Sequence, residues 1–204
     1  MADLDPQNAA ASTWVFGYGS LVDPASLGRT LGRTVTPGAD FLEAELAGWG
    51  RRWNYGVGRV PAMWRTTDGT LVDDGVIVAL GLVAAPTEDV NGIVARVSDA
   101  ELAALDLRER DYDRLDVTDA VEVQETVIGH VGAADRIVTY VPRPSAVQRY
   151  EAARDSGQAG IRSSYWGLVD AAFAVLGSDR LARYRSTTPS PDVPVVVMIE
   201  PSAD

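Results

Sequence analysis

The stretch from Val15 to Leu21 joins an apolar segment to two closely spaced glycines, and it carries residues that could position a ligand. Gly17 and Gly19 allow backbone angles that a side chain disfavours, so the chain is expected to turn sharply just after Tyr18. Backbone N–H groups exposed at such a turn can hold a carboxylate or a developing oxyanion. The alternative is that the glycines only make a tight turn from strand to helix and bind no ligand.

The residues after this turn predict a helix. Asp23 is a favoured N-cap and Pro24 a favoured first residue, so we expect one short helix over 24–31, ended by Gly32. The turn lacks both the glycine spacing of a dinucleotide site and the lysine of a phosphate loop. Nucleotide binding is therefore poorly supported.

A second candidate for chemistry is Glu109. Ser98 and Glu101 form a capping-box pattern that predicts a helix over 99–108 and places Glu109 at its C-terminal end. The negative end of a helix disfavours a charged carboxylate, and burial acts in the same direction, which would suit a residue that transfers protons. The neighbouring Arg108 and Arg110 oppose this effect if they lie close, and the charged run from 108 to 114 could equally be a solvated turn.

Composition excludes several other chemistries. The chain has 204 residues and no cysteine, so disulfides, thiolate metal sites and cysteine nucleophiles are absent. Its one histidine, His130, lies between glycines in an expected hairpin turn, where a solvated role is the simplest interpretation. We therefore expect no metal and no cofactor. A formal charge of −11 without a large basic cluster makes nucleic acid an unexpected partner.

The chain has the composition of one globular domain. It is 46% hydrophobic and 23% charged, and no apolar run reaches the length of a membrane span. Residues 1–12 are polar and lack the basic start and apolar centre of a secretory signal, so they are expected to be a flexible N-terminus of a cytoplasmic protein. Residues 13–200 are expected to form a single domain. Membrane partners are not expected, and the sequence leaves the oligomeric state open.

The elements between these motifs are mostly strands. Strands are predicted at 41–46, 51–55, 76–83, 91–97, 117–127 and 136–141, with a long excursion at 58–74. Together they suggest a curled sheet or small barrel. Alternation places Arg51 and Arg52 on opposite faces, so one of them points inward. That arginine could meet a substrate carboxylate, or its stem could simply pack while its head reaches solvent.

The last third of the chain is predicted to be mainly helical. Helices are expected at 145–155 and 161–176, the second with an apolar stripe that is most simply core packing. A proline-rich connector at 186–194 then leads to an edge strand at 195–199.

Several separated stretches together resemble one family, the gamma-glutamylcyclotransferases, including their ChaC-like glutathione-degrading branch. The segment 16–21 (Phe-Gly-Tyr-Gly-Ser-Leu) is similar to the family's substrate loop, and 48–53 is similar to its next segment, in which paired arginines follow a glycine and an aromatic residue. The Leu-Asp-x-x-Glu pattern that ends at Glu109 resembles the family's catalytic segment. Tyr140 and the region 150–165 also fit. The loop departs from the ChaC-like branch after Leu21, and residues 58–91 follow no branch.

The resemblance implies an α+β fold, a small mixed β-barrel with flanking helices. It implies substrate binding by Tyr18, Gly19, Ser20, Leu21 and Tyr140, and proton transfer by Glu109. The implied reaction releases 5-oxoproline from a small gamma-glutamyl substrate, whose own α-amine is the nucleophile, so that no protein nucleophile, metal or cofactor is needed. Two alternatives remain open: a non-catalytic module that binds a gamma-glutamyl or other carboxylate ligand, and a hydrolase in which Glu109 activates water.

Overall fold

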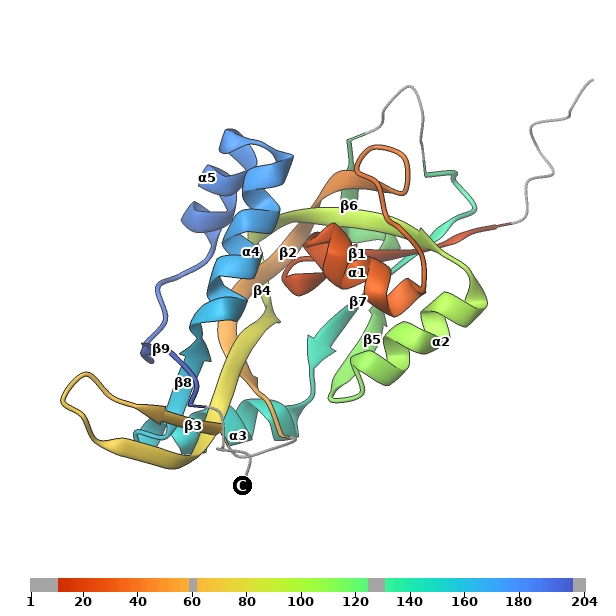
Figure 1. Cartoon of the computed structure of the whole chain (residues 1–204). Coiled ribbons are helices and arrows are strands. Elements are labelled where there is room, and N and C mark those ends of the chain that lie inside the picture. Colours follow the sequence, from red (N-terminus) through yellow and green to blue (C-terminus); the bar gives the residue numbers. More distant parts are fainter. Residues whose placement is uncertain (1–10, 59–61, 125–130, 200–204) are drawn as a thin grey trace, which may run out of the picture.

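Long antiparallel strands dominate the computed structural model, which describes residues 11–58, 62–124 and 131–199 (Figure 1). The described strands are β1 (Thr13–Gly17), β2 (Phe41–Gly56), β3 (Ala62–Arg65), β4 (Leu71–Val97), β5 (Tyr112–Asp116), β6 (Val121–Val123), β7 (Arg136–Pro142), β8 (Ala159–Arg162) and β9 (Val195–Val196). The described helices are α1 (Pro24–Leu31), α2 (Asp99–Arg108), α3 (Pro144–Asp155), α4 (Ser163–Leu176) and α5 (Ser178–Thr187), with 3-10 turns η2 (Ser20–Val22) and η3 (Thr118–Ala120).

The sheet is mixed and open. Its main path runs β5-β7-β1-β4-β2-β6, and β3, β8 and β9 extend it from β4. β1 is antiparallel to β4 and parallel to β7. The predicted α+β class, a mixed sheet with flanking helices, is confirmed. The sheet does not close into a barrel, because no pairing among the described residues joins the edge strands β5 and β6, and β6 has only three residues.

β2 and β4 form one long antiparallel ribbon. The two strands predicted at 76–83 and 91–97 are parts of the single strand β4, and the residues between them continue it past an irregularity opposite Ala47 and Trp49. Gly48 lies at this irregularity with a φ of 79°, a left-handed value that favours glycine. Within β4, Val78, Leu80 and Leu82 are buried in the core, whereas Ile77 and Ala79 on the other face line a cavity.

The first two helices have the predicted bounds because their caps are local. The Asp23 side chain accepts a hydrogen bond of 2.6 Å from the Ser26 N–H, and Gly32 ends α1 with a φ of 69°. Ser98 and Glu101 form both bonds of the capping box at the start of α2. In Figure 1 these two helices lie side by side beside the sheet.

Other predicted elements need correction. The expected strand at 117–127 is replaced by the turn η3 and the short β6, while β5 forms from the charged run that was interpreted as a solvated turn. The helix expected from residue 161 begins at Ser163, because 159–162 is β8, which pairs in parallel with β4. α5 was not predicted. His130 and residues 1–10 of the expected flexible N-terminus lie outside the described residues.

The start of β1 is fixed by one carboxylate. Asp135 accepts hydrogen bonds from the Ser12 N–H at 2.8 Å and from the Trp14 indole N–H at 2.9 Å, which secures β1 beside β7. Among the described residues, no helix is both long and apolar enough to cross a membrane.

Candidate functional site

The turn after β1 is tightly built. A Cβ atom on Gly17 would stand 2.8 Å from the Leu21 Cβ, so the close approach of these two residues requires the glycine. The Tyr18 hydroxyl donates a 2.8 Å hydrogen bond to the Tyr140 carbonyl, and the Val22 N–H donates to the Gly19 carbonyl at 3.0 Å. The predicted sharp turn is therefore present, and it leads directly into η2.

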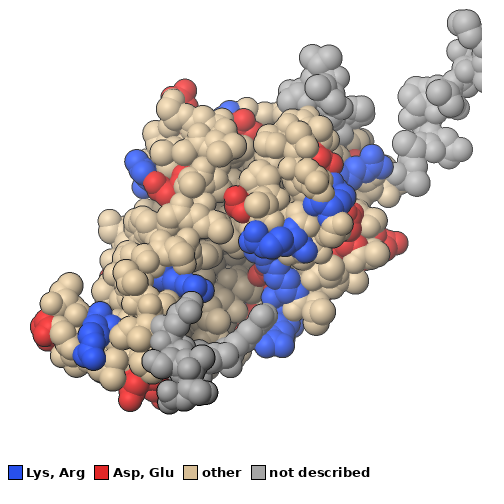
Figure 2. Space-filling model, in the orientation of Figure 1, with Lys and Arg blue, Asp and Glu red and all other residues tan. Residues whose placement is uncertain are grey.

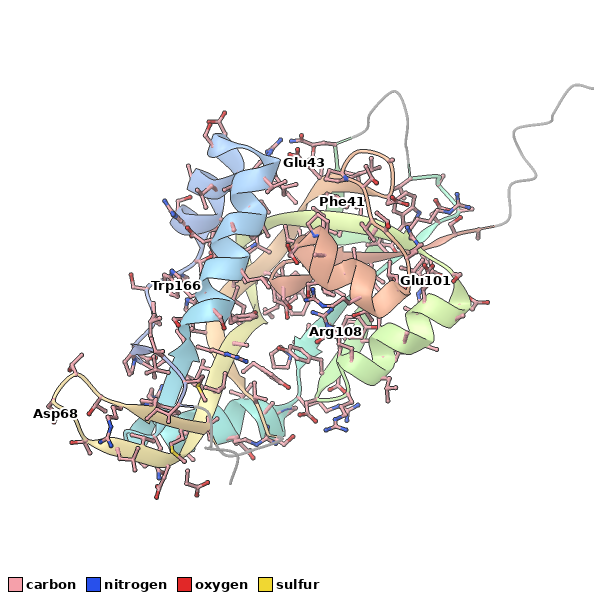
Figure 3. The ribbon with its side chains drawn as sticks, viewed as in Figure 1. Phe41, Glu43, Asp68, Glu101, Arg108 and Trp166 are labelled. Atoms are coloured by element: carbon pink, nitrogen blue, oxygen red, sulfur yellow. The ribbon has the colours of Figure 1, made fainter. Side chains whose placement is uncertain are left out.

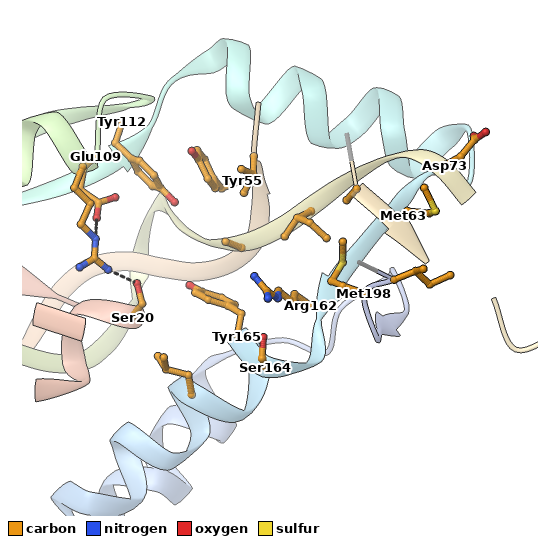
Figure 4. A pocket seen from close by; sticks show the side chains of 17 residues that line it. Ser20, Tyr55, Met63, Asp73, Glu109, Tyr112, Arg162, Ser164, Tyr165 and Met198 are labelled. Carbon is orange, nitrogen blue, oxygen red and sulfur yellow. Dashed lines mark hydrogen bonds and ion pairs between the residues drawn. The ribbon is translucent and has the colours of Figure 1, made fainter. Parts of the chain in front are cut away.

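A cavity of about 740 Å³ opens beside this turn, within the size range of small-molecule sites (Figure 4). At its inner end lies a hollow of about 30 Å³, roughly the volume of one water molecule. Tyr18, Gly19, Ser20, Leu21 and Tyr140, the residues expected to bind substrate, all line the hollow, together with Glu109. The cavity and the hollow share Ser20, Glu109, Tyr112 and Tyr165, so they form one continuous space.

Glu109 caps the C-terminus of α2. Its backbone N–H donates to the Leu105 carbonyl at 2.8 Å, and its side chain is only 14% exposed. One carboxylate oxygen lies 2.9 Å from the Nε of Arg108, so the arginine that was expected to oppose the effect of the helix end does lie close. Figure 4 shows the pair at one end of the cavity.

Arg108 connects Glu109 to the turn. Its guanidinium donates to the Ser20 hydroxyl at 2.9 Å, and in α1 it donates to the Ser26 carbonyl and the Thr30 hydroxyl. Figure 3 shows this side chain between α1 and α2. The position of the Glu109 carboxylate is thereby tied to the position of the turn over 18–21, through a side chain to which the sequence assigned no such role.

Two further tyrosines border the hollow. The Tyr112 hydroxyl donates to the Leu80 carbonyl at 3.1 Å, and the Tyr165 hydroxyl accepts from the Leu80 N–H at 3.4 Å. Burial raises the pKa of Tyr18, Tyr112 and Tyr165, so all three stay protonated at neutral pH. The sequence assigned neither tyrosine to the site, because Tyr112 lies in a charged run that is typical of a solvated turn and Tyr165 belongs to a helix stripe that is typical of core packing.

Tyr140 borders the hollow, but its hydroxyl is directed to another partner. It donates to Asp106 at 2.8 Å, and Asp106 in turn pairs with Arg114 at 2.6 Å. Burial, together with this hydrogen bond, raises the pKa of the Tyr140 hydroxyl. Tyr140 therefore lines the hollow while its hydroxyl is bonded to Asp106, and its backbone carbonyl accepts the hydrogen bond from the Tyr18 hydroxyl.

Of the paired arginines, Arg51 is the inward one. It is fully buried, whereas Arg52 pairs with Glu88 near the surface at 2.5 Å. Arg51 does not line the cavity or the hollow. Its Nε donates to the Tyr18 carbonyl at 2.9 Å, and other donors reach the Thr188 hydroxyl and the Asn91 carbonyl. Arg51 therefore holds the turn through the Tyr18 carbonyl and lies outside the cavity and the hollow, where a substrate carboxylate could have reached it.

Several solved structures have a fold similar to that of this chain. A protein described as a gamma-glutamyl cyclotransferase has a TM-score of 0.52 at 15% identity, with coverage of 88% of this chain and 89% of that one. The chain has the fold of the gamma-glutamyl cyclotransferases. A yeast gamma-glutamyl cyclotransferase described as specific to glutathione has a TM-score of 0.50 at 15% identity, covering 87% of this chain and 97% of its own. An uncharacterized human protein has a TM-score of 0.50 at 15% identity, covering 88% and 89%.

Sequence comparison alone does not reach this result. No family model and no curated protein matches the chain. At 15% sequence identity, these solved structures share the fold of this chain. A shared fold does not by itself imply a shared reaction, so the function depends on the residues of the site.

Proposed function

We propose that the chain is a gamma-glutamylcyclotransferase that releases 5-oxoproline from a gamma-glutamyl peptide or amine. The observation that carries the proposal is the hollow in which Glu109 faces the turn over 18–21. A carboxylate opposite a substrate-binding turn is the arrangement that cyclisation needs, because the substrate brings its own nucleophile. We also propose that the protein acts in the cytoplasm.

In the proposed reaction, the α-amine of the gamma-glutamyl group attacks the γ-carbonyl carbon. A C–N bond closes the five-membered ring while the amide bond to the departing amine breaks. Glu109 takes a proton from the α-ammonium group and delivers one to the nitrogen of the departing amine, so protons balance without water. Well-oriented intramolecular attack can reach effective molarities on the order of 10⁵ M or more, and orienting the substrate is the role we assign to the turn.

The surrounding residues support this division of roles. Arg108 holds both the Glu109 carboxylate and the Ser20 hydroxyl, which keeps the base and the turn at a fixed separation. Tyr112 and Tyr165 enclose the hollow with aromatic surface, which limits access of bulk water to the reacting groups. Among the described residues, no cluster of three or more acidic or histidine side chains could hold a metal ion.

The deciding experiment is incubation with a panel of gamma-glutamyl dipeptides, gamma-glutamyl amines and gamma-glutamyl thiol peptides, with products identified by mass. Release of 5-oxoproline with the intact amine is the expected result. Release of glutamate would instead identify a hydrolase in which Glu109 activates water. Saturable binding with neither product would identify a non-catalytic binding module.

A further inference from the structure

The helix α5 is joined to the sheet by charged side chains. Arg183 of α5 pairs with Glu45 of β2 at 3.2 Å and also with Asp89 of β4. Arg180, one helical turn earlier, pairs with Glu43 of β2. These three ion pairs attach α5 to both strands of the β2–β4 ribbon, and we refer to them as the α5 clasp.

The C-terminal end of α5 contacts the buried guanidinium of Arg51. The Nη1 of Arg51 donates to the Thr188 hydroxyl at 3.0 Å and to the Thr187 hydroxyl at 3.3 Å. The Thr188 hydroxyl itself donates to the Tyr184 carbonyl at 2.6 Å, which directs its oxygen lone pairs toward Arg51. The rings of Tyr184 and of Phe173 in α4 also lie against the guanidinium. The α4–α5 pair therefore encloses one side of Arg51.

The same guanidinium holds the turn over 18–21. Its Nε donates to the Tyr18 carbonyl at 2.9 Å, and α4 packs directly against η2, which follows the turn. If α5 left the ribbon, Arg51 would lose hydroxyl acceptors and a ring face, and its buried charge would need water as a new partner. The donor that now fixes the Tyr18 carbonyl would no longer be held in one position.

We infer that the α5 clasp positions the turn over 18–21, and that Arg51 carries this effect from the surface of the ribbon to the turn. Docking of α5 and order in the turn are then coupled, and because such coupling is reciprocal, a ligand that orders the turn also favours docking of α5. The arginine side chains of the clasp are 27% and 37% exposed, so salt screens their ion pairs. The order of the turn therefore depends on ionic strength.

Hydrogen exchange of the Val22 amide tests this coupling, because that N–H donates to the Gly19 carbonyl within the turn. The double variant Arg180→Gln, Arg183→Gln should exchange this amide about 10-fold faster, since a partly exposed ion pair typically contributes up to a factor of about 5. The matched control is Arg185→Gln, which removes an α5 arginine whose ion pair with Asp170 stays within the α4–α5 pair. Figure 2 shows basic and acidic side chains next to one another on this side of the molecule.

Two further measurements separate the route through Arg51 from a general loss of stability. Thr188→Val removes a hydroxyl acceptor of Arg51, leaves the clasp intact and should also speed exchange at Val22. The Val117 amide, which donates to the Ile137 carbonyl at 2.9 Å, reports on the rest of the sheet and should be unchanged in every variant. Raising NaCl from about 0.05 M to about 1 M should speed Val22 exchange in the wild-type protein and have little effect in the double variant.

Unchanged exchange at Val22 in the double variant would overturn the inference, as would an equal effect of Arg185→Gln. Equal acceleration at Val22 and Val117 would show a general loss of stability and would overturn it as well. Wild-type exchange in Thr188→Val would rule out the route through Arg51. These measurements need no substrate, so their outcome does not depend on the proposed function.

Discussion

The Nε of Arg51 donates a 2.9 Å hydrogen bond to the carbonyl oxygen of Tyr18. This bond joins the middle of β2 to the turn over 18–21, and the same guanidinium reaches hydroxyl groups at the end of α5. The guanidinium carbon Cζ of Arg51 lies 5.2 Å from the ring centre of Phe173 and 5.0 Å from that of Tyr184. Burial lowers the pKa of Arg51 to about 10, so the side chain stays charged at neutral pH. Carbonyl dipoles, hydroxyls and ring faces thus surround a buried cation.

We expect Arg51→Lys to lower the free energy of unfolding by about 2 kcal/mol or more, measured by denaturant titration. Lysine keeps the charge, but its single ammonium group cannot span acceptors that the planar guanidinium reaches in several directions, and a buried acceptor left unpaired costs about 1–3 kcal/mol. Arg52→Lys, which alters a surface ion pair, should cost at most about 1 kcal/mol. Equal losses in the two variants would show that the buried contacts contribute little.

Glu109→Gln should lower turnover by roughly 10² or more with substrate binding largely retained. The substitution keeps the shape of the side chain and removes the group that accepts a proton, so the loss belongs to the transition state. The measurement is 5-oxoproline release, with thermal unfolding recorded on the same preparation. Glu88→Gln, which removes a carboxylate from the surface pair with Arg52, is the control. Turnover near the wild-type value in Glu109→Gln would exclude the catalytic role.

A side chain at Gly19 should obstruct the hollow. A Cβ there stands 3.2 Å from the Tyr165 hydroxyl, and the two methyl groups of valine add to this contact. We expect Gly19→Val to raise KM at least about 10-fold, because the added methyl groups fill the hollow beside the turn against which the gamma-glutamyl group is proposed to bind. Gly167→Ala, whose Cβ meets no atom within 4 Å, provides the comparison. Wild-type kinetics in a normally folded Gly19→Val protein would show that the turn is not the site.

Alkaline pH should destabilise the fold through the buried tyrosines. Burial raises the pKa of Tyr18, Tyr112 and Tyr165 in the folded state, whereas the unfolded chain releases these protons near pH 10. Above that pH the folded state binds more protons, so the free energy of unfolding falls as pH rises, by about 1.4 kcal/mol per pH unit for each tyrosine that stays protonated. The contribution is fully present below pH 10.

The fall in the free energy of unfolding can be measured between pH 9 and 12, with unfolding followed by tyrosinate absorbance. Tyr112→Phe should make the decline less steep, since one fewer group is released on unfolding. A decline of identical steepness in the variant would show that Tyr112 titrates similarly in both states.

Turnover should not require a metal ion. We expect prolonged treatment with a chelator to leave 5-oxoproline release unchanged, because the proposed mechanism uses only Glu109 and the oriented substrate. Carboxylate-only sites for Ca²⁺ or Mg²⁺ are known in proteins, so the chelated protein should also be assayed with added divalent ions. Loss of turnover that a divalent ion restores would contradict this prediction.

Sequence predicted the elements whose determinants are local. The Asp23 cap and the Ser98–Glu101 capping box each act within one turn of helix, and α1 and α2 have the expected bounds as a result. β5 was missed because its charged residues favour a turn, and only pairing with β7 makes them a strand. The sequence left a curled sheet and a small barrel as alternatives for a similar reason, since the closure of a sheet depends on which distant strands pair.

The residues of the candidate site likewise fall into those that local sequence predicts and those that only strand pairing places there. Tyr18 to Leu21 and Glu109 stand out through local glycines and a helix end, together with a family resemblance. Arg162 and Tyr112 line the cavity because β5 and β8 are placed on the same sheet, through pairings with β7 and β4. No pattern near either residue reveals that placement.

The parallel pairing of β1 with β7 has a consequence for the order of events during synthesis. β1 is made early, but its sheet partners lie at 93–97 and 136–138, and two hydroxyl acceptors of Arg51 lie at the end of α5 and just after it, at 187 and 188. Contacts of such sequence separation form slowly, because a long loop must close first. During synthesis, the described contacts that hold the turn over 18–21 are therefore completed only after residue 188 has left the ribosome.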